Sequence, residues 1–176
     1  MIFPDLDAET REQMRIEVLR DIGENNLNLS KRFKPGAEMD YPQILLDAVD
    51  HGNPETFANS LSRANLFNSH ELRNTKNGPI EAKVPVTAPQ TFAEGEFNRF
   101  YMRGLCSRAI AADINQLTIY RAKEVSSPRP ESQAMIDTTV QASALLEDLR
   151  IHTDVDTALH LPPGPNSGIS VRLPTP

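Results

Sequence analysis

The sequence predicts an α+β protein in which a helical N-terminal half packs on a small antiparallel or mixed sheet. Three observations favour this class. Segments with helical periodicity and capping residues fill residues 1–66, and segments that alternate apolar and polar residues begin near 80, 116 and 167. Most of the 14 prolines follow residue 78, which indicates short elements joined by extended proline-rich segments. We expect one domain over 1–176.

Three helices are expected in a helical lobe that spans about 1–66. The first runs over 8–22 with Asp7 as its N-cap, and its apolar residues recur at helical spacing. The second begins near 40 and stops at 52. The third follows at once with Asn53 as its cap and a proline in its first turn, where a missing N–H costs little. Two helices joined this tightly must pack as a sharply angled or antiparallel pair.

An exposed loop is expected over 67–79, because this stretch is rich in polar residues and ends in the turn signal KNGP. An α+β lobe over about 80–176 follows the loop. Its strands are expected at 80–86, 116–125 and 167–173, with a helix near 142–150 between the last two.

The segment TFAEGEFNRFYMRGLCSRAI, which begins at Thr91, predicts a helix with a capping-box spacing. One face gathers four large residues and a glycine, typical of a core face: Phe97, Phe100, Tyr101, Gly104 and Leu105. The glycine indicates that another backbone approaches closely. Arg99 and Arg103 lie on the other side, where two interpretations stay open: an ordinary solvated face, or an exposed basic pair that binds an anion or an acidic partner.

Composition narrows the function classes. The chain carries 18 basic and 24 acidic residues, and a net charge of −6 argues against nonspecific binding of nucleic acid. No apolar run is long enough to span a membrane, and the N-terminus lacks the basic and apolar regions of a signal peptide. The single cysteine, Cys106, has no bridging partner, so we expect an inert thiol and a reducing, cytoplasmic compartment.

Two patterns resemble metal chemistry, and we expect neither to bind a metal. Glu81 and Lys83 have the E-x-K spacing of metal-dependent nucleases, but the upstream aspartates lie in a predicted helix. The stretch IHTDVDTALH contains four candidate ligands that no regular element brings to one side: His152, Asp154, Asp156 and His160. One of the two aspartates more simply caps a short helix. We therefore predict no metal, no cofactor and no catalytic residue.

Several phrases resemble, as a set, a family of small uncharacterised proteins from bacterial genomes and their phages or prophages. They are KVPVTAP, EGEFNRFYMRGLC, YRAKEVSSPRPES, ALLEDLR and LPPGPNSGISVRL, which together span about 83–173. No site residue follows from this resemblance. It implies a structural or assembly role in a phage particle, and proline-stiffened segments suit docking onto neighbours because they lose little entropy on ordering.

The predicted function is a non-enzymatic phage virion subunit of the head, portal or neck region. It would associate with itself and with neighbouring subunits, and it would end in the virion. We predict contacts to an acidic partner through Arg99, Arg103 and Arg121. Two alternatives remain: a metal-dependent nuclease or related nucleic-acid enzyme that uses Glu81 and Lys83, and a small regulatory or immunity-type protein that binds one partner.

Overall fold

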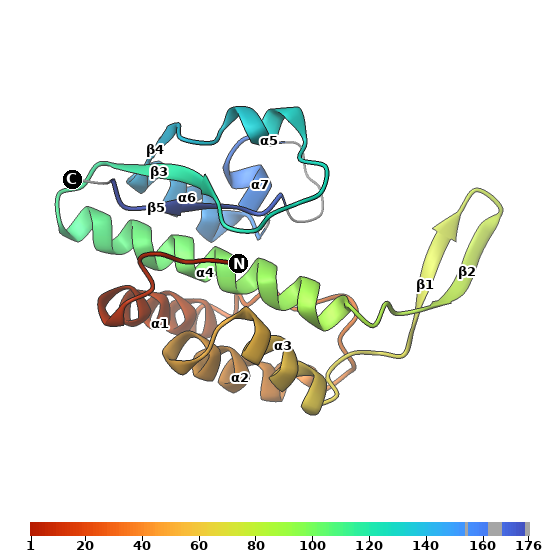
Figure 1. The fold of residues 1–176 in the computed structure, drawn as a ribbon. Coiled ribbons are helices and arrows are strands. Elements are labelled where there is room, and N and C mark those ends of the chain that lie inside the picture. Colours follow the sequence, from red (N-terminus) through yellow and green to blue (C-terminus); the bar gives the residue numbers. More distant parts are fainter. Residues whose placement is uncertain (154, 162–166, 175–176) are drawn as a thin grey trace.

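The structure is a computed structural model that describes residues 1–153, 155–161 and 167–174 of the 176-residue chain. It has an α+β fold with a helical N-terminal half and two small antiparallel sheets, so the predicted fold class is confirmed. Figure 1 shows the long helix α4 (Ala88–Ala111) running through the middle of the molecule. The helices of the N-terminal half lie on one side of α4, and a sheet with shorter helices lies on the other.

The N-terminal half contains α1 (Ala8–Gly23), α2 (Ala37–His51) and α3 (Pro54–Arg63). Both predicted caps are present. The Asp7 carboxylate accepts a hydrogen bond from the Thr10 amide at 3.0 Å, and the Asn53 side chain accepts two amides at the start of α3. The second helix begins earlier than predicted, because Gly36 has a φ of +90° and turns the chain directly into α2.

Helix α4 is buried over three full turns, since every residue from Glu96 to Cys106 is buried. The predicted capping box at Thr91 is wrong, because the helix already begins at Ala88 with Pro89 in its first turn. We expected only one face of this helix to be buried. Instead, the N-terminal helices cover one side of α4 and the sheet with its helices covers the other. No helix among the described residues is long and apolar enough to cross a membrane.

The larger sheet has the order β4–β3–β5 and is antiparallel throughout. Its strands are β3 (Gln116–Arg121), β4 (Thr139–Gln141) and β5 (Ile169–Arg172). Leu117 lies opposite Val140, and Ile119 lies opposite Val171, so the terminal strand pairs within its own chain. Three helices accompany the sheet: α5 (Pro130–Ala134), α6 (Ala142–Ile151) and α7 (Val155–Ala158). The strand predicted near 80 belongs to another sheet, and β4 was not predicted.

A separate hairpin replaces most of the loop predicted over 67–79. Its strands are β1 (His70–Thr75) and β2 (Gly78–Lys83), and we call residues 70–83 the arm. The two-residue connection at Lys76 and Asn77 leads into Gly78, whose φ of +107° suits a tight hairpin turn. In Figure 1 the arm extends away from the body of the molecule, beyond the N-terminal end of α4.

Helices α1 and α4 touch backbone to backbone at Gly104, which confirms the close approach predicted there. A Cβ atom built on Gly104 would lie 2.7 Å from Met14 Cγ, 2.8 Å from Met14 N and 3.0 Å from Thr10 O. Two of these atoms belong to the backbone and cannot rotate away. Gly95, in the same helix, offers the opposite environment, because a Cβ built there meets no described atom within 4 Å.

We predict that Gly104→Ala lowers the free energy of unfolding by about 1–3 kcal/mol, since the added methyl forces α1 and α4 apart. Gly95→Ala, the matched control, should raise it by up to about 1 kcal/mol through helix propensity alone. Urea denaturation of the two variants and the parent measures both effects. Equal free energies for the two variants would show that the helices do not touch at Gly104.

Candidate functional site

The predicted exposed basic pair is not exposed. The side chains of Arg99 and Arg103 are 1% and 0% exposed. The side of α4 that carries them faces α1 instead of solvent, because the N-terminal helices cover this side and the sheet covers the other. The proposal that these two arginines contact an acidic partner at the surface therefore requires correction: their acidic partners are internal.

Arg103 joins α4 to α1 through two carboxylates. Its Nε and Nη2 donate to Glu17 Oε2 at 3.0 and 2.8 Å, and its Nη1 donates to Asp21 Oδ2 at 2.6 Å. Arg150 of α6 donates to the same glutamate, with Nη2 at 2.5 Å from Glu17 Oε1. One carboxylate on α1 thus binds arginines from two other helices.

Arg99 extends this cluster toward α2. Its Nη2 donates to Glu96 Oε2 at 2.9 Å, and its Nη1 lies 3.6 Å from Asp21 Oδ2. Tyr41 of α2 donates its hydroxyl to Glu96 at 3.3 Å. The Arg99 guanidinium also lies 4.5 Å from the centre of the Phe100 ring.

The cluster contains three carboxylates and three guanidinium groups, which balance in charge: Glu17, Asp21, Glu96, Arg99, Arg103 and Arg150. Burial would raise the pKa of Glu17, but hydrogen bonds from Arg150 and Arg103 outweigh it and hold that pKa below the usual range. A balanced, buried cluster of this kind orients three helices.

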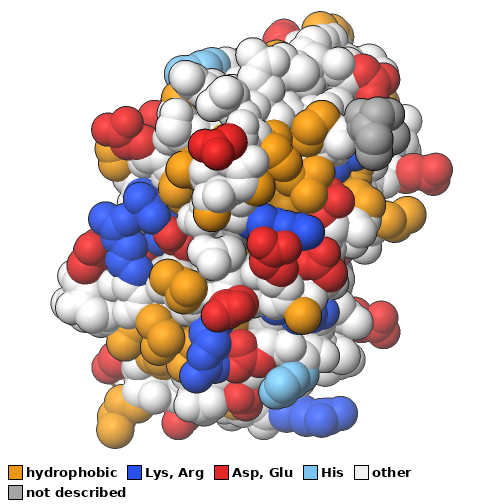
Figure 2. Space-filling model, turned by 90° about the vertical axis from the view of Figure 1, so that its left-hand side faces the viewer, with side chains coloured by type: hydrophobic (Ala, Val, Ile, Leu, Met, Phe, Trp, Pro, Cys, Tyr) orange, Lys and Arg blue, Asp and Glu red, His pale blue; other side chains and the backbone are white. Residues whose placement is uncertain are grey.

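The third predicted contact residue, Arg121, is also bound within the chain. It is half-buried at the end of β3, where it donates to the Ser167 carbonyl at 2.7 Å and to Gln133 Oε1 at 3.1 Å. The three predicted arginines therefore do not share a surface. Figure 2 shows the face turned away from the arm, where basic and acidic side chains lie side by side.

The other chemical candidates are dispersed. Cys106 is fully buried, and burial raises the pKa of its thiol. Glu81 and Lys83 lie on exposed positions of β2 in the arm. In the IHTDVDTALH stretch, Asp154 lies outside the described residues, and Asp156 binds Arg129 at 2.6 Å. Among the residues that the structure describes, no three potential ligands lie close enough to hold a metal ion.

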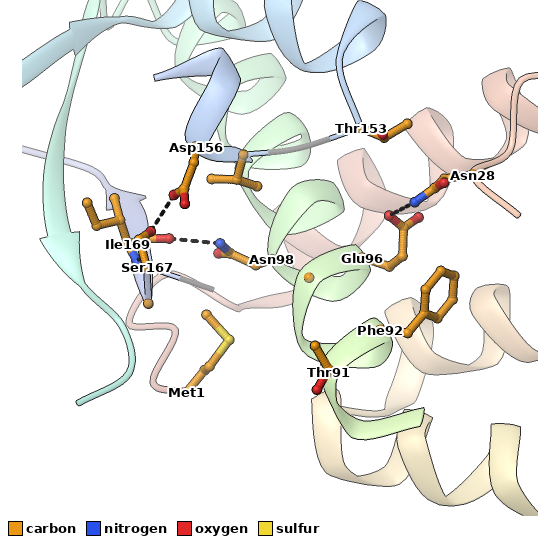
Figure 3. Close-up of a pocket in the computed structure, with 13 residues that line it drawn as sticks. Met1, Asn28, Thr91, Phe92, Glu96, Asn98, Thr153, Asp156, Ser167 and Ile169 are labelled. Carbon is orange, nitrogen blue, oxygen red and sulfur yellow. Dashed lines mark hydrogen bonds between the residues drawn. The ribbon is translucent and has the colours of Figure 1, made fainter. Parts of the chain in front are cut away.

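A pocket of about 230 Å³ opens beside the first half of α4 (Figure 3). Asn98 lies on one side with Asp156 and Ser167, and Phe92 and Glu96 lie on the other. Spacing alone did not predict this pocket, because its described lining residues come from five separate stretches of the chain.

The groups in the pocket are tied to one another. Ser167 Oγ donates to Asp156 Oδ1 at 2.5 Å, Asn98 Nδ2 donates to the Ile169 carbonyl at 2.8 Å, and Asn28 Nδ2 donates to Glu96 Oε1 at 2.7 Å. Asp156 also accepts a hydrogen bond from Arg129 Nη2 at 2.6 Å, so this carboxylate is bound by a serine and an arginine at once. The arrangement suits binding through hydrogen-bond acceptors better than nucleophilic catalysis.

The arm is the second candidate site, and its base is fixed to the body. Arg32 binds Glu71 at 2.6 Å and 3.1 Å, and Phe33 and Phe67 form an isolated β-bridge with their rings 4.9 Å apart. Beyond this base, β1 and β2 pair only with each other among the described strands. The sequence predicted only part of the arm. KNGP indicated the turn, but apolar and polar residues do not alternate in HELRNT, so β1 was not recognised as a strand.

Compared with known proteins, the chain matches no family model, no curated protein and no solved structure.

We predict that Arg103→Met lowers the free energy of unfolding by about 3–5 kcal/mol, because it leaves Glu17 and Asp21 buried with too few partners. Arg20→Met, the matched control in the exposed Arg20–Glu24 pair, should cost less than about 1 kcal/mol. Urea denaturation measures both. Similar losses in the two variants would contradict the assignment of a structural role to the buried cluster.

A pH dependence follows from Glu17. Its pKa is lower in the folded chain than in the unfolded chain, so its stabilising contribution is present above the unfolded pKa and is lost as the pH falls through the folded pKa. The free energy of unfolding should therefore decrease below a pH of about 4. Glu17→Gln should be less stable at neutral pH and show a shallower decrease, measured by urea denaturation at several pH values. An unchanged slope would contradict this role.

Proposed function

We propose that the protein is a non-enzymatic assembly subunit whose arm docks onto a second copy of the chain. The observation that carries this proposal is the exposure of large aliphatic side chains on both faces of the arm. Leu72 is 81% exposed and Ile80 is 50% exposed. The two residues lie on opposite faces, because Leu72 pairs with Glu81 and Ile80 pairs with Arg73 in the hairpin register.

An isolated two-stranded hairpin is at best marginally stable in water. Among the described strands, both outer edges of this arm are unpaired, and each of its faces exposes one large aliphatic side chain, which are features that strand addition and interface burial use. Its base is attached to the body through the Arg32–Glu71 hydrogen bonds and the Phe33–Phe67 bridge. A hairpin fixed at one end therefore presents a preformed surface to a neighbour.

Charge favours a second copy as the occupant. The arm has three basic and two acidic residues, so its net charge is +1: Arg73, Lys76, Lys83, Glu71 and Glu81. The whole chain carries −6, and taking away the arm's +1 leaves −7 on the remaining residues. A basic arm and an acidic body in one molecule can dock head to tail, and such contacts close into rings when the rotation allows.

The setting that we propose is a phage particle, in its head, portal or neck region. The support for it is the resemblance of the segments over about 83–173 to small uncharacterised proteins from bacterial genomes and their phages or prophages. Ring-forming subunits with projecting arms suit that setting, because each arm repeats the same contact around the ring.

We predict that the double variant Leu72→Thr/Ile80→Thr weakens self-association. The dissociation constant Kd should rise about tenfold to hundredfold, since two aliphatic side chains are no longer buried at the contact. Threonine keeps the strand propensity of both positions. Light scattering coupled to size-exclusion chromatography over a range of concentrations measures the change. Met39→Gln is the matched control, because Met39 is 82% exposed but lies on α2.

An arm-less chain gives a second test. The Val84 amide donates to the Ser69 carbonyl at 2.9 Å, so the ends left by removing residues 70–83 already lie side by side and an Asn-Gly turn can join them. This chain should stay monomeric where the parent assembles. A parent that is monomeric at every concentration would contradict docking between copies, and a one-to-one complex with another protein would then favour the regulatory alternative.

A further inference from the structure

Asn98 carries an acceptor that the described chain leaves unused. The residue is only 5% exposed, and its side-chain amide nitrogen donates a hydrogen bond to the Ile169 carbonyl at 2.8 Å. This bond fixes the orientation of the amide. The other atom, Oδ1, is buried and has no hydrogen-bond partner among the described residues. A buried carbonyl without a hydrogen-bond partner destabilises the fold by about 1–3 kcal/mol. A ligand that donates a hydrogen bond to this oxygen therefore binds with a favourable free energy.

The lining around Asn98 favours a cation. It contains two carboxylates, Asp156 and Glu96, and no lysine, arginine or histidine among its described residues. Each carboxylate is paired with an arginine outside the lining, but carboxylate oxygens accept several hydrogen bonds. The ring of Phe92 adds an apolar face with a negative potential, the surface that ammonium and guanidinium groups prefer.

The size of the pocket restricts the ligand. A volume of about 230 Å³ lies below the range of about 300–1,000 Å³ for drug-sized ligands, so a side chain or a molecule of few atoms fits. Gly95 also lines the pocket, and a Cβ atom built on it meets no described atom within 4 Å. A larger residue at this position would fill the pocket.

We propose that this pocket binds a small organic cation, an alkylammonium or alkylguanidinium group, whose N–H donates to Asn98 Oδ1. Two sources offer this chemistry: a free small amine, or a basic side chain such as Lys76 at the tip of the arm of a second copy. The pocket and its acceptor are present within one chain, so the proposal does not depend on the docking of the arm.

The experiment titrates the full chain with n-butylammonium chloride and follows the side-chain amide signals of Asn98 by two-dimensional NMR. n-Butanol, a neutral molecule of the same shape, is the control for apolar binding, and sodium chloride is the control for ionic strength. We expect saturable shifts at Asn98 with butylammonium and at least tenfold weaker binding of butanol.

Two variants test the location. Asn98→Leu removes the acceptor and should abolish the saturable shifts, which are then read at the backbone amide of Gly95. Because Asn98 also binds Ile169, Gly95→Leu provides a second test that keeps this bond, places its side chain in open space and improves helix propensity. It should block binding with the fold intact. Gly23→Leu, at an equally open position at the end of α1, should bind as the parent does.

Self-association of the chain shows whether the bound cation is a free amine or a side chain of the arm. If butylammonium also dissociates the self-associated chain, and Lys76→Gln weakens association, the cation is an arm side chain. If association is unchanged, the ligand is a free amine, and either result supports the site. Absence of saturable shifts, equal binding of butanol, or unchanged binding to Gly95→Leu would overturn the proposal, whatever the arm does.

Discussion

The whole body depends on one constraint: a helix that is buried on every side must find internal partners for its charged residues. Helix α4 carries Arg99 and Arg103 where solvent would normally receive them, and both are buried. An unpaired buried charge is too costly to persist, so Glu17 and Asp21 of α1 must lie against them. Arg150 then fixes α6 to the same glutamate. These ion pairs alone orient α1, α4 and α6 relative to one another.

Apolar packing completes the same arrangement. Gly104 lets α1 approach α4 closely enough for the short hydrogen bonds of Arg103 to Glu17 and Asp21. On the other side, Ile119 and Val171 of the sheet are fully buried. The body thus closes its polar groups internally, whereas the arm leaves its aliphatic side chains and strand edges uncovered. This contrast is the reason why we propose that the arm and the pocket contact other molecules, whereas the stability of the body depends on α4.

Local signals in the sequence were sufficient for much of the fold. The caps at Asp7 and Asn53, the strands near 116 and 167, and the close contact at Gly104 were predicted from neighbouring residues. The exposure of Arg99 and Arg103 was predicted wrongly, because a helical projection shows which residues share a face but not whether a second layer covers it.

The partners that decide such questions are distant in the chain. Arg103 binds a glutamate 86 positions away, and Arg150 binds it across 133 positions. No local pattern reports such pairs. The same holds for the pocket, where Asn98 meets Ile169 across 71 positions. In the arm the turn was recognised, but β1 has no alternation, since neither face of the hairpin is buried by the body.

Hydrogen–deuterium exchange of the intact chain, measured at low and high concentration, tests the central claim that the body is closed and the arm is open. We predict that amides of α4 between Glu96 and Cys106 exchange slowest at both concentrations, because only global unfolding exposes them. Amides of the arm should exchange fast in the dilute chain and become protected as it associates. Fast exchange in α4, or an arm that is equally protected at both concentrations, would contradict the account.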